Sequence, residues 1–154
     1  MIFFAVVLLV LAGDQISKLM VRRYLPLDQS KPIIKGIISF THIKNSGAAF
    51  GILPNKQWLF LIIAIVAIAA AVLFILNNKE KGGLTQLALG LAVGGALGNL
   101  MDRFLFGNVT DFIDFHFWPV FNFADTSIFV GMFLLIIIIM REPGSLNELE
   151  KTDK

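Results

Sequence analysis

The chain has 154 residues, of which 56% are hydrophobic, and its formal net charge is only +2. A soluble domain is closer to about 45–50% apolar. The excess lies in runs of about 20 residues, so the sequence predicts one integral-membrane domain over residues 1–154. Cysteine is absent, which excludes disulfides and thiol nucleophiles. His42 and His116 lack the spacing of a metal motif and no basic stripe favours nucleic acid, so we expect no metal, no other cofactor and no nucleic-acid partner.

The first expected span covers residues 1–23, where an apolar run continues past two charged residues, Asp14 and Lys18. These residues lie at i and i+4, so on a helix they share a face and can form an ion pair. Within lipid, pairing lowers the cost of both charges, provided that their face looks into the helix bundle. A structural ion pair and a substrate-facing role are both open for them.

Residues 26–56 differ in kind, because three prolines argue against a continuous helix. Short runs rich in β-branched residues between polar turns favour a small sheet lying on the membrane surface. The segment 45–50 then reads NSGAAF, in which Asn45 can hydrogen-bond peptide groups and Gly47 lets another backbone approach closely. We therefore expect an extended peptide to add to this sheet. A glycine-rich turn without a ligand is the alternative.

Residues 57–76 form a nearly uninterrupted apolar run, which predicts a second span that serves as scaffold. The third expected span covers residues 84–104. In this span Gly90, Gly94 and Gly98 recur at every fourth position, so one helix face has no side chains. Such a face is typical of close helix packing in membranes, and it gives these glycines a structural role.

Polar residues gather where the third span ends, namely Asn99, Asp102 and Arg103. Asn99 and Arg103 lie at i and i+4 and share a helix face. The connector over residues 104–123 is rich in aromatic residues, which we expect to anchor it at the bilayer interface. The connector also carries Asp111, which we expect on a loop.

A fourth apolar span is expected over residues 124–141, and Asp125 opens it. Asp125 or Thr126 could cap this helix. If the connector folds back, Asp111 and Asp125 meet at one membrane face. Two close carboxylates cannot readily both ionise, so one keeps a proton while the other acts as a base, which is the chemistry of metal-free peptide hydrolysis. A helix cap and a solvated loop charge are the alternatives for these two residues.

Five short motifs stand in order along the chain. They are Asp14-Gln15-x-x-Lys18, Asn45-x-Gly47-Ala48-Ala49-Phe50, Gly98-Asn99-x-x-Asp102-Arg103, Val109-x-Asp111-Phe112-Ile113-Asp114 and Phe121-Asn122-x-Ala124-Asp125-x-Ser127. Each motif is weak alone, but in this order on four spans they closely resemble bacterial lipoprotein signal peptidase, also called signal peptidase II. The resemblance covers nearly the whole chain, from Asp14 to the end of the last span.

The resemblance implies an all-α membrane protein, with four transmembrane helices and a small extracytoplasmic β-type segment between the first and second. It implies an aspartic endopeptidase that removes signal peptides from diacylglyceryl-modified prolipoproteins, cutting before the lipidated cysteine. Asp111 and Asp125 would be its catalytic pair. The residues implied to bind substrate are Asp14, Lys18, Asn45, Gly47, Asn99, Arg103, Asn122 and Ala124, and those implied to give structural support are Asp102, Gly94 and Gly98.

The resemblance also implies a multi-pass protein of the bacterial cytoplasmic (inner) membrane, with both termini cytoplasmic and the active site toward the outer face. Its partners would be lipidated prolipoproteins and membrane lipid, and we expect it to act as a monomer. The positive charges that flank the spans do not choose an orientation clearly. The alternative function is a small transporter or channel subunit with an intramembrane charge relay, for which we find no internal sequence symmetry.

Overall fold

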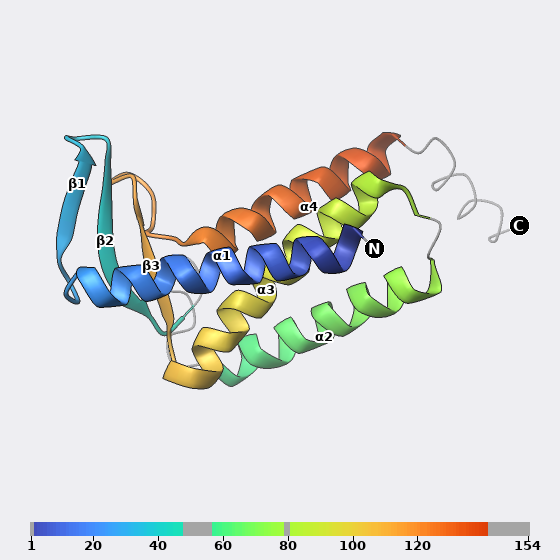
Figure 1. Cartoon of the computed structure of the whole chain (residues 1–154), viewed down its shortest axis with the longest axis horizontal. Coiled ribbons are helices and arrows are strands. Elements are labelled where there is room, and N and C mark those ends of the chain that lie inside the picture. The colour runs from blue at the N-terminus through green and yellow to red at the C-terminus, as the bar shows by residue number, and fades with distance from the viewer. Residues whose placement is uncertain (1, 48–56, 79–80, 142–154) are drawn as a thin grey trace, which may run out of the picture.

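Four helices and a small sheet make up the protein, seen in a computed structural model that describes residues 2–47, 57–78 and 81–141. The helices lie alongside one another and the sheet covers one end of them (Figure 1). The helices are α1 (Ile2–Tyr24), α2 (Gln57–Asn77), α3 (Gly83–Phe106) and α4 (Phe123–Arg141). Each begins and ends within two residues of the span expected from the sequence, because the long apolar runs decide where these helices lie.

Among the described residues, three helices, α1, α3 and α4, are long and apolar enough to cross a membrane. In α2, the stretch Leu61–Asn77 is a shorter apolar helix. The start of α1 and the end of α4 lie at the same end of the molecule, away from the sheet (Figure 1). The sheet therefore marks the opposite end of the helix bundle.

Helix α3 is the centre of the bundle, and its glycines explain how the other helices approach it. A Cβ on Gly90 would come within 2.8 Å of Val6, and one on Gly94 within 2.8 Å of Val10, both on α1. A Cβ on Gly98 would overlap the carboxyl group of Asp14. The glycine face predicted from the sequence is thus confirmed as the seam between α1 and α3, because backbones touch only where side chains are missing.

The sheet has three antiparallel strands in the order β1-β2-β3, namely β1 (Ser30–Ile34), β2 (Ile38–Asn45) and β3 (Val109–Asp114). The expected β-type segment between α1 and α2 supplies β1 and β2. The third strand comes from the connector after α3, so the description of the chain as all-α with one β segment was incomplete. From its aromatic residues, the connector had been interpreted as an interfacial anchor and not as a strand.

Gly107 directs the chain from α3 into β3. It has a left-handed φ of 72°, and its N–H donates to the carbonyl of Arg103, which ends the helix. Val109 then pairs with Asn45 across the β2–β3 ladder. The connector is not uniformly a surface belt: Phe112 is buried, whereas Phe117 is 84% exposed. The expected interfacial anchoring can therefore apply only to the exposed aromatics.

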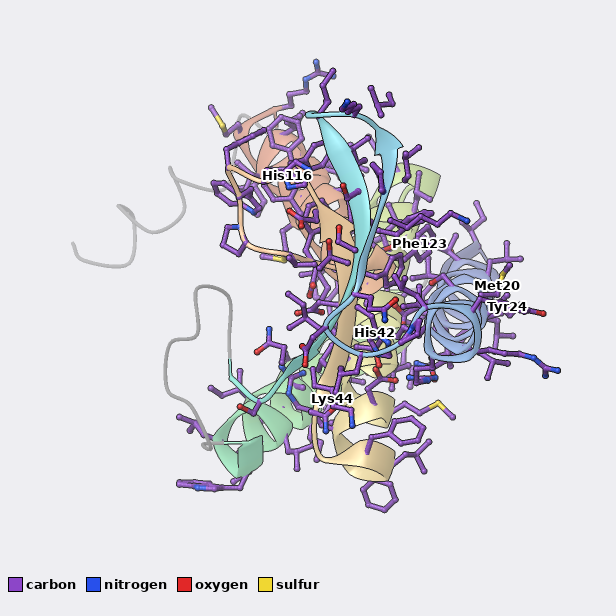
Figure 2. All side chains as sticks on the ribbon, turned by 90° about the vertical axis from the view of Figure 1, so that its left-hand side faces the viewer. Met20, Tyr24, His42, Lys44, His116 and Phe123 are labelled. Atoms are coloured by element: carbon purple, nitrogen blue, oxygen red, sulfur yellow. The ribbon has the colours of Figure 1, made fainter. Side chains whose placement is uncertain are left out.

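The sheet is tied to the end of α1 by His42 on β2. His42 Nδ1 donates to the carbonyl of Leu25, just after the helix, at 2.7 Å. Figure 2 looks onto this end of the molecule and shows His42 between the sheet and α1, where Met20 and Tyr24 are labelled. Lys44 and His116 lie toward opposite ends of the sheet (Figure 2). The hydrogen bond of His42 therefore fixes the sheet, including the strand that carries Asp111, against the end of α1.

Candidate active site

Asp111 lies on strand β3 and not on a loop, which corrects the expectation from the sequence. It pairs with Ile43 of β2, and a bulge between Phe40 and Ile43 shifts the register beside it. Asn45, two residues farther along β2, donates from Nδ2 to Asp111 Oδ2 at 2.8 Å. Asp111 is 3% exposed, so the sheet both fixes this carboxyl group and removes it from water.

Asp125 lies in the first turn of α4, held by a reciprocal cap. Asn122 Oδ1 accepts the backbone N–H of Asp125 at 2.9 Å, and Asp125 Oδ2 accepts the backbone N–H of Asn122 at 3.2 Å. This is the capping-box arrangement, in which the side chain of each residue accepts the otherwise unpaired backbone N–H of the other. The N-cap of α4 is therefore Asn122, which was not among the caps expected from the sequence, and Asp125 takes part as the second residue of the capping box.

The side chains of Asn122 and Asn99 join the two acidic residues. Asn122 Nδ2 donates to Asp111 Oδ1 at 2.6 Å and to Asn99 Oδ1 at 3.1 Å. Asn99 Nδ2 donates to Asp125 Oδ1 at 2.7 Å. Asp111 and Asp125 are thus connected through two amides, and their separation is set by buried hydrogen bonds from α3, β3 and the start of α4.

Burial, together with the neighbouring Asp125 carboxylate acting in the same direction, raises the pKa of Asp111 to about 7. Hydrogen bonds from Asn45 and Asn122 oppose the shift without cancelling it. A carboxyl group with such a pKa can keep its proton near neutral pH while its partner stays ionised. The arrangement can therefore supply a proton donor and a base side by side.

Lys18 forms the centre of a buried polar cluster beneath this pair. Its Nζ lies 2.8 Å from Asp14 Oδ2 and 3.6 Å from Asp102 Oδ2, and it donates to Asn99 Oδ1 at 2.8 Å. The side chains of Lys18, Asp14 and Asp102 have no exposed surface. The predicted ion pair of Asp14 and Lys18 is confirmed, and its burial favours the structural alternative over a substrate-facing one.

The same cluster ties α1 to α4 and α3. Asp14 Oδ1 accepts the backbone N–H of Ala124 at 3.0 Å, which anchors the start of α4. Gln15 Nε2 donates to the carbonyl of Gly98 at 3.1 Å and to Asp102 Oδ1 at 3.3 Å. A buried charge is tolerated only where such partners surround it. Ala124 and Gly98 therefore matter through their backbone, since a larger residue at either position would separate the helices.

Arg103 and Gly47 lie on the other side of the acidic pair. Arg103 Nη1 donates to the carbonyl of Asn99, and its Nη2 donates to the carbonyl of Gly47, each at 3.3 Å. The N–H of Gly47 donates to Asn45 Oδ1 at 2.9 Å. The sequence also predicted that residues 48–50 bind peptide, and these residues lie outside the described part of the chain. Asn45, Gly47 and Arg103 are thus gathered beside Asp111 from two distant parts of the sequence.

Comparison with known proteins decides what kind of site this is. The profile of the family "Signal peptidase (SPase) II" matches residues 6–141. The chain belongs to the signal peptidase II family. It is 44% identical over 139 residues to a lipoprotein signal peptidase of Halothermothrix orenii, covering 90% of this chain and 95% of that protein. It is 38% identical over 151 residues to one of Pelotomaculum thermopropionicum, covering 98% and 99% respectively.

Two solved structures support the same assignment. Both are described as bacterial membrane enzymes determined by the in meso method, one at 2.3 Å and the other at 1.9 Å. The first has a TM-score of 0.87 with 34% identity and covers 92% of this chain and 89% of its own. The second has a TM-score of 0.83 with 34% identity, covering 91% and 93%. This signal peptidase II is therefore an aspartic peptidase and a multi-pass enzyme of a bacterial membrane.

Three further polar residues of this signal peptidase II received no role from its sequence, namely Gln15, Arg22 and Thr110, although Gln15 stands in the first motif. Gln15 follows Asp14 directly, and helical spacing alone does not tell whether it looks into the bundle. Thr110 forms a β-branched pair with Val109, which is a weak strand signal. Arg22 resembles any basic residue at a membrane edge. In the structure Arg22 Nη1 donates to Thr110 Oγ1 at 3.0 Å.

Asp114 lies three residues beyond Asp111 and belongs to a separate group at the edge of the sheet. Thr41 Oγ1 donates to its Oδ2 and the N–H of His116 donates to its Oδ1, each at 2.7 Å. Although burial raises its pKa, these hydrogen bonds bring the pKa of Asp114 below the ordinary 3.8.

In residues 2–47, 57–78 and 81–141, no three His, Asp or Glu residues are grouped as metal ligands.

Proposed function

We propose that Asp111 and Asp125 are the catalytic pair of this signal peptidase II. The observation that carries the proposal is the bridge of Asn122 and Asn99, which holds both carboxyl groups, one on Asp111 and one on Asp125, in a single hydrogen-bonded set. The raised pKa of Asp111 lets this carboxyl group keep a proton near neutral pH, as the proton donor of acid–base catalysis must.

Asp125 acts as the general base in this mechanism. Its carboxylate takes a proton from a water molecule while the water oxygen attacks the scissile carbonyl carbon. Asp111 gives its proton to the carbonyl oxygen, which forms a neutral tetrahedral intermediate. The C–N bond then breaks as Asp125 passes its proton to the leaving nitrogen, and the hydroxyl proton returns to Asp111. Protons balance over the cycle, and the pair is ready for another turnover.

The remaining site residues divide into two groups by where they lie. We propose that Asn45, Gly47 and Arg103 meet the peptide backbone of the substrate, since they lie beside Asp111 at the edge of the sheet. The fully or largely buried residues would position the catalytic pair, and they are Asp14, Lys18, Asn99, Asp102, Asn122 and Ala124. A substrate-binding role for Asp14 or Lys18 is disfavoured, because neither side chain has any exposed surface.

The substrate would be a prolipoprotein, as the names of the relatives indicate for those proteins. We propose that it carries a diacylglyceryl group and is cut before the lipidated cysteine. Apolar side chains such as Leu8 and Leu9 are exposed on the bundle, so acyl chains can remain in lipid while the peptide lies across the sheet. Burial of each acyl methylene contributes about 0.8 kcal/mol, so the lipid can supply much of the binding free energy.

The topology proposed is four spans, including α2, with both termini in the cytoplasm and the active site toward the outer face of the membrane. The arrangement in Figure 1 supports it, since the sheet, whose strand β3 carries Asp111, lies at the end opposite the start of α1. A monomer is expected, because the pair and its supporting network come from one chain. Membership of the peptidase family leaves the transporter alternative without support.

The test compares two forms of one precursor, diacylglyceryl-modified and unmodified, at equal concentrations with purified protein in one detergent. We expect the modified form to be cut and the unmodified form to remain intact. The Asp111→Asn variant is the control for contaminating peptidases and should cut neither. Equal cleavage of both forms would mean that the lipid is not recognised, and a general membrane aspartic peptidase would then describe the protein better.

A further inference from the structure

Arg22 lies one turn beyond Lys18 on α1 and reaches the beginning of β3, the strand that carries Asp111. Its Nη1 donates to Thr110 Oγ1 at 3.0 Å and to Asp102 Oδ1 at 3.4 Å. Asp102 Oδ2 accepts the backbone N–H of Thr110 at 2.9 Å. The hydroxyl group of Thr110 is therefore held by Arg22 of α1, and its backbone N–H is held by Asp102 of α3. Arg22 and Asp102 also form an ion pair with each other.

The guanidinium group of Arg22 is itself fixed in orientation. It lies over the ring of Phe106, with 4.6 Å between the guanidinium carbon and the ring centroid. Stacking on an aromatic face while hydrogen-bonding in the guanidinium plane is a geometry that arginine provides and lysine does not. The side chain of Arg22 is 23% exposed, whereas that of its partner Asp102 is fully buried, so the ion pair is only partly open to water.

The strand needs such an anchor because its pairing with β2 is irregular at the critical position. The ladder shifts between Phe40 and Ile43, and Ile43 is the residue that pairs with Asp111. A bulge disrupts the ladder locally, so regular backbone pairing holds Asp111 only from the side of Thr110, which pairs with Lys44. Thr110 lies immediately before Asp111, and neighbouring side chains of a strand point to opposite faces. Holding Thr110 from one face therefore sets where Asp111 stands on the other.

We infer that Arg22 is a positioning residue for the peptidase reaction, which acts by holding Thr110 so that the Asp111 carboxyl group faces Asp125. The inference rests on the proposed role of Asp111. Arg22 does not touch the reacting atoms, and its loss leaves Asp102 paired with Lys18 and Gln15. The fold should therefore survive, while the carboxyl group gains freedom to shift. A displacement of about 1 Å can lower a rate about 100-fold.

The experiment measures kcat and KM separately for cleavage of a diacylglyceryl-modified precursor by Arg22→Gln, Thr110→Val and the double variant. We expect kcat to fall about 10- to 100-fold in each single variant with KM nearly unchanged. The double variant should be no slower than the slower single one, since both remove the same contact. Arg23→Gln is the matched control, because Arg23 is exposed and lies over Tyr24.

A purely structural role predicts a different pattern: a lower melting temperature with unchanged kcat in the folded fraction, or effects that multiply in the double variant. Either result would overturn the inference. If Arg22→Gln fails to fold, Thr110→Val decides alone, because it removes only a hydroxyl group. The failure of the proposed function is distinguished by Asp111→Asn. Cleavage by that variant refutes the catalytic pair, whereas an inactive Asp111→Asn together with normal Arg22→Gln and Thr110→Val refutes only the positioning role.

Discussion

Replacing Asp111 with asparagine should change how the stability of the protein depends on pH. The pKa of Asp111 rises from the ordinary 3.8 to about 7 in the folded state. Between these values the folded state binds more protons than the unfolded state, so this carboxyl group makes the free energy of unfolding fall as pH rises. Each pH unit corresponds to about 1.4 kcal/mol, which gives roughly 2–3 kcal/mol between about pH 5 and pH 7.

The substitution also has an effect that does not depend on pH. Both oxygens of Asp111 accept hydrogen bonds, from Asn45 and Asn122, so the new amide places a donor opposite a donor. Such an unpaired buried donor costs about 1–3 kcal/mol. The absolute stability of the variant is therefore not the test. The test is the difference in free energy of unfolding between variant and wild type, which should shift in favour of the variant by roughly 2–3 kcal/mol from pH 5 to pH 7.

Thermal unfolding of the purified proteins in one detergent measures this difference. For a chain of this size the change corresponds to roughly 5–10 °C in the relative melting temperature. Asp28→Asn is the matched control, because Asp28 is an exposed carboxyl group at the surface. A difference between Asp111→Asn and wild type that stays constant over this pH range would refute the reasoning, since Asp111 would then titrate as an ordinary carboxyl group.

Three further predictions follow from the same geometry. Gly94→Ala should destabilise the protein by about 1–3 kcal/mol, because its Cβ would lie 2.8 Å from Val10, whereas Gly82→Ala meets open space; equal melting temperatures would contradict this. The kcat/KM of the wild type should fall as pH rises through about 7, as the Asp111 proton is lost, and a flat profile would contradict the shared proton. Asp114→Asn should retain cleavage but lose stability above about pH 4, a loss that shrinks as pH falls because the pKa of Asp114 is lowered; abolished turnover would give it a catalytic role.

The helical frame was predictable because its signals are local. Apolar runs placed the four helices, the i, i+4 spacing predicted the ion pair of Asp14 and Lys18, and the glycine repeat predicted the seam on α3. Each of these features depends on one segment and on a single helical period. No knowledge of the neighbouring segments is needed to recognise them.

The features that the sequence did not predict depend on contacts between distant segments. Strand β3 forms only by pairing with β2, which lies far away in the sequence. Asn45 and Asp111, for example, are hydrogen-bonded although they are 66 residues apart. Asn122 joins β3, α3 and α4. The sequence offered Asp125 or Thr126 as the cap, because the expected span began one residue later than α4 does. Arg22 was missed because its partners, Asp102 and Thr110, lie on other elements.

The most direct test of the account is cleavage of the diacylglyceryl-modified precursor by Asp111→Asn and Asp125→Asn, each compared with Asp114→Asn at matched folded concentration. The account predicts that both variants of the pair lose turnover completely on the assay timescale, because acid–base chemistry needs both groups. They should still remain folded and membrane-embedded, while Asp114→Asn continues to cut. Near-normal cleavage by either Asp111→Asn or Asp125→Asn would contradict the central claim that these two carboxyl groups act together.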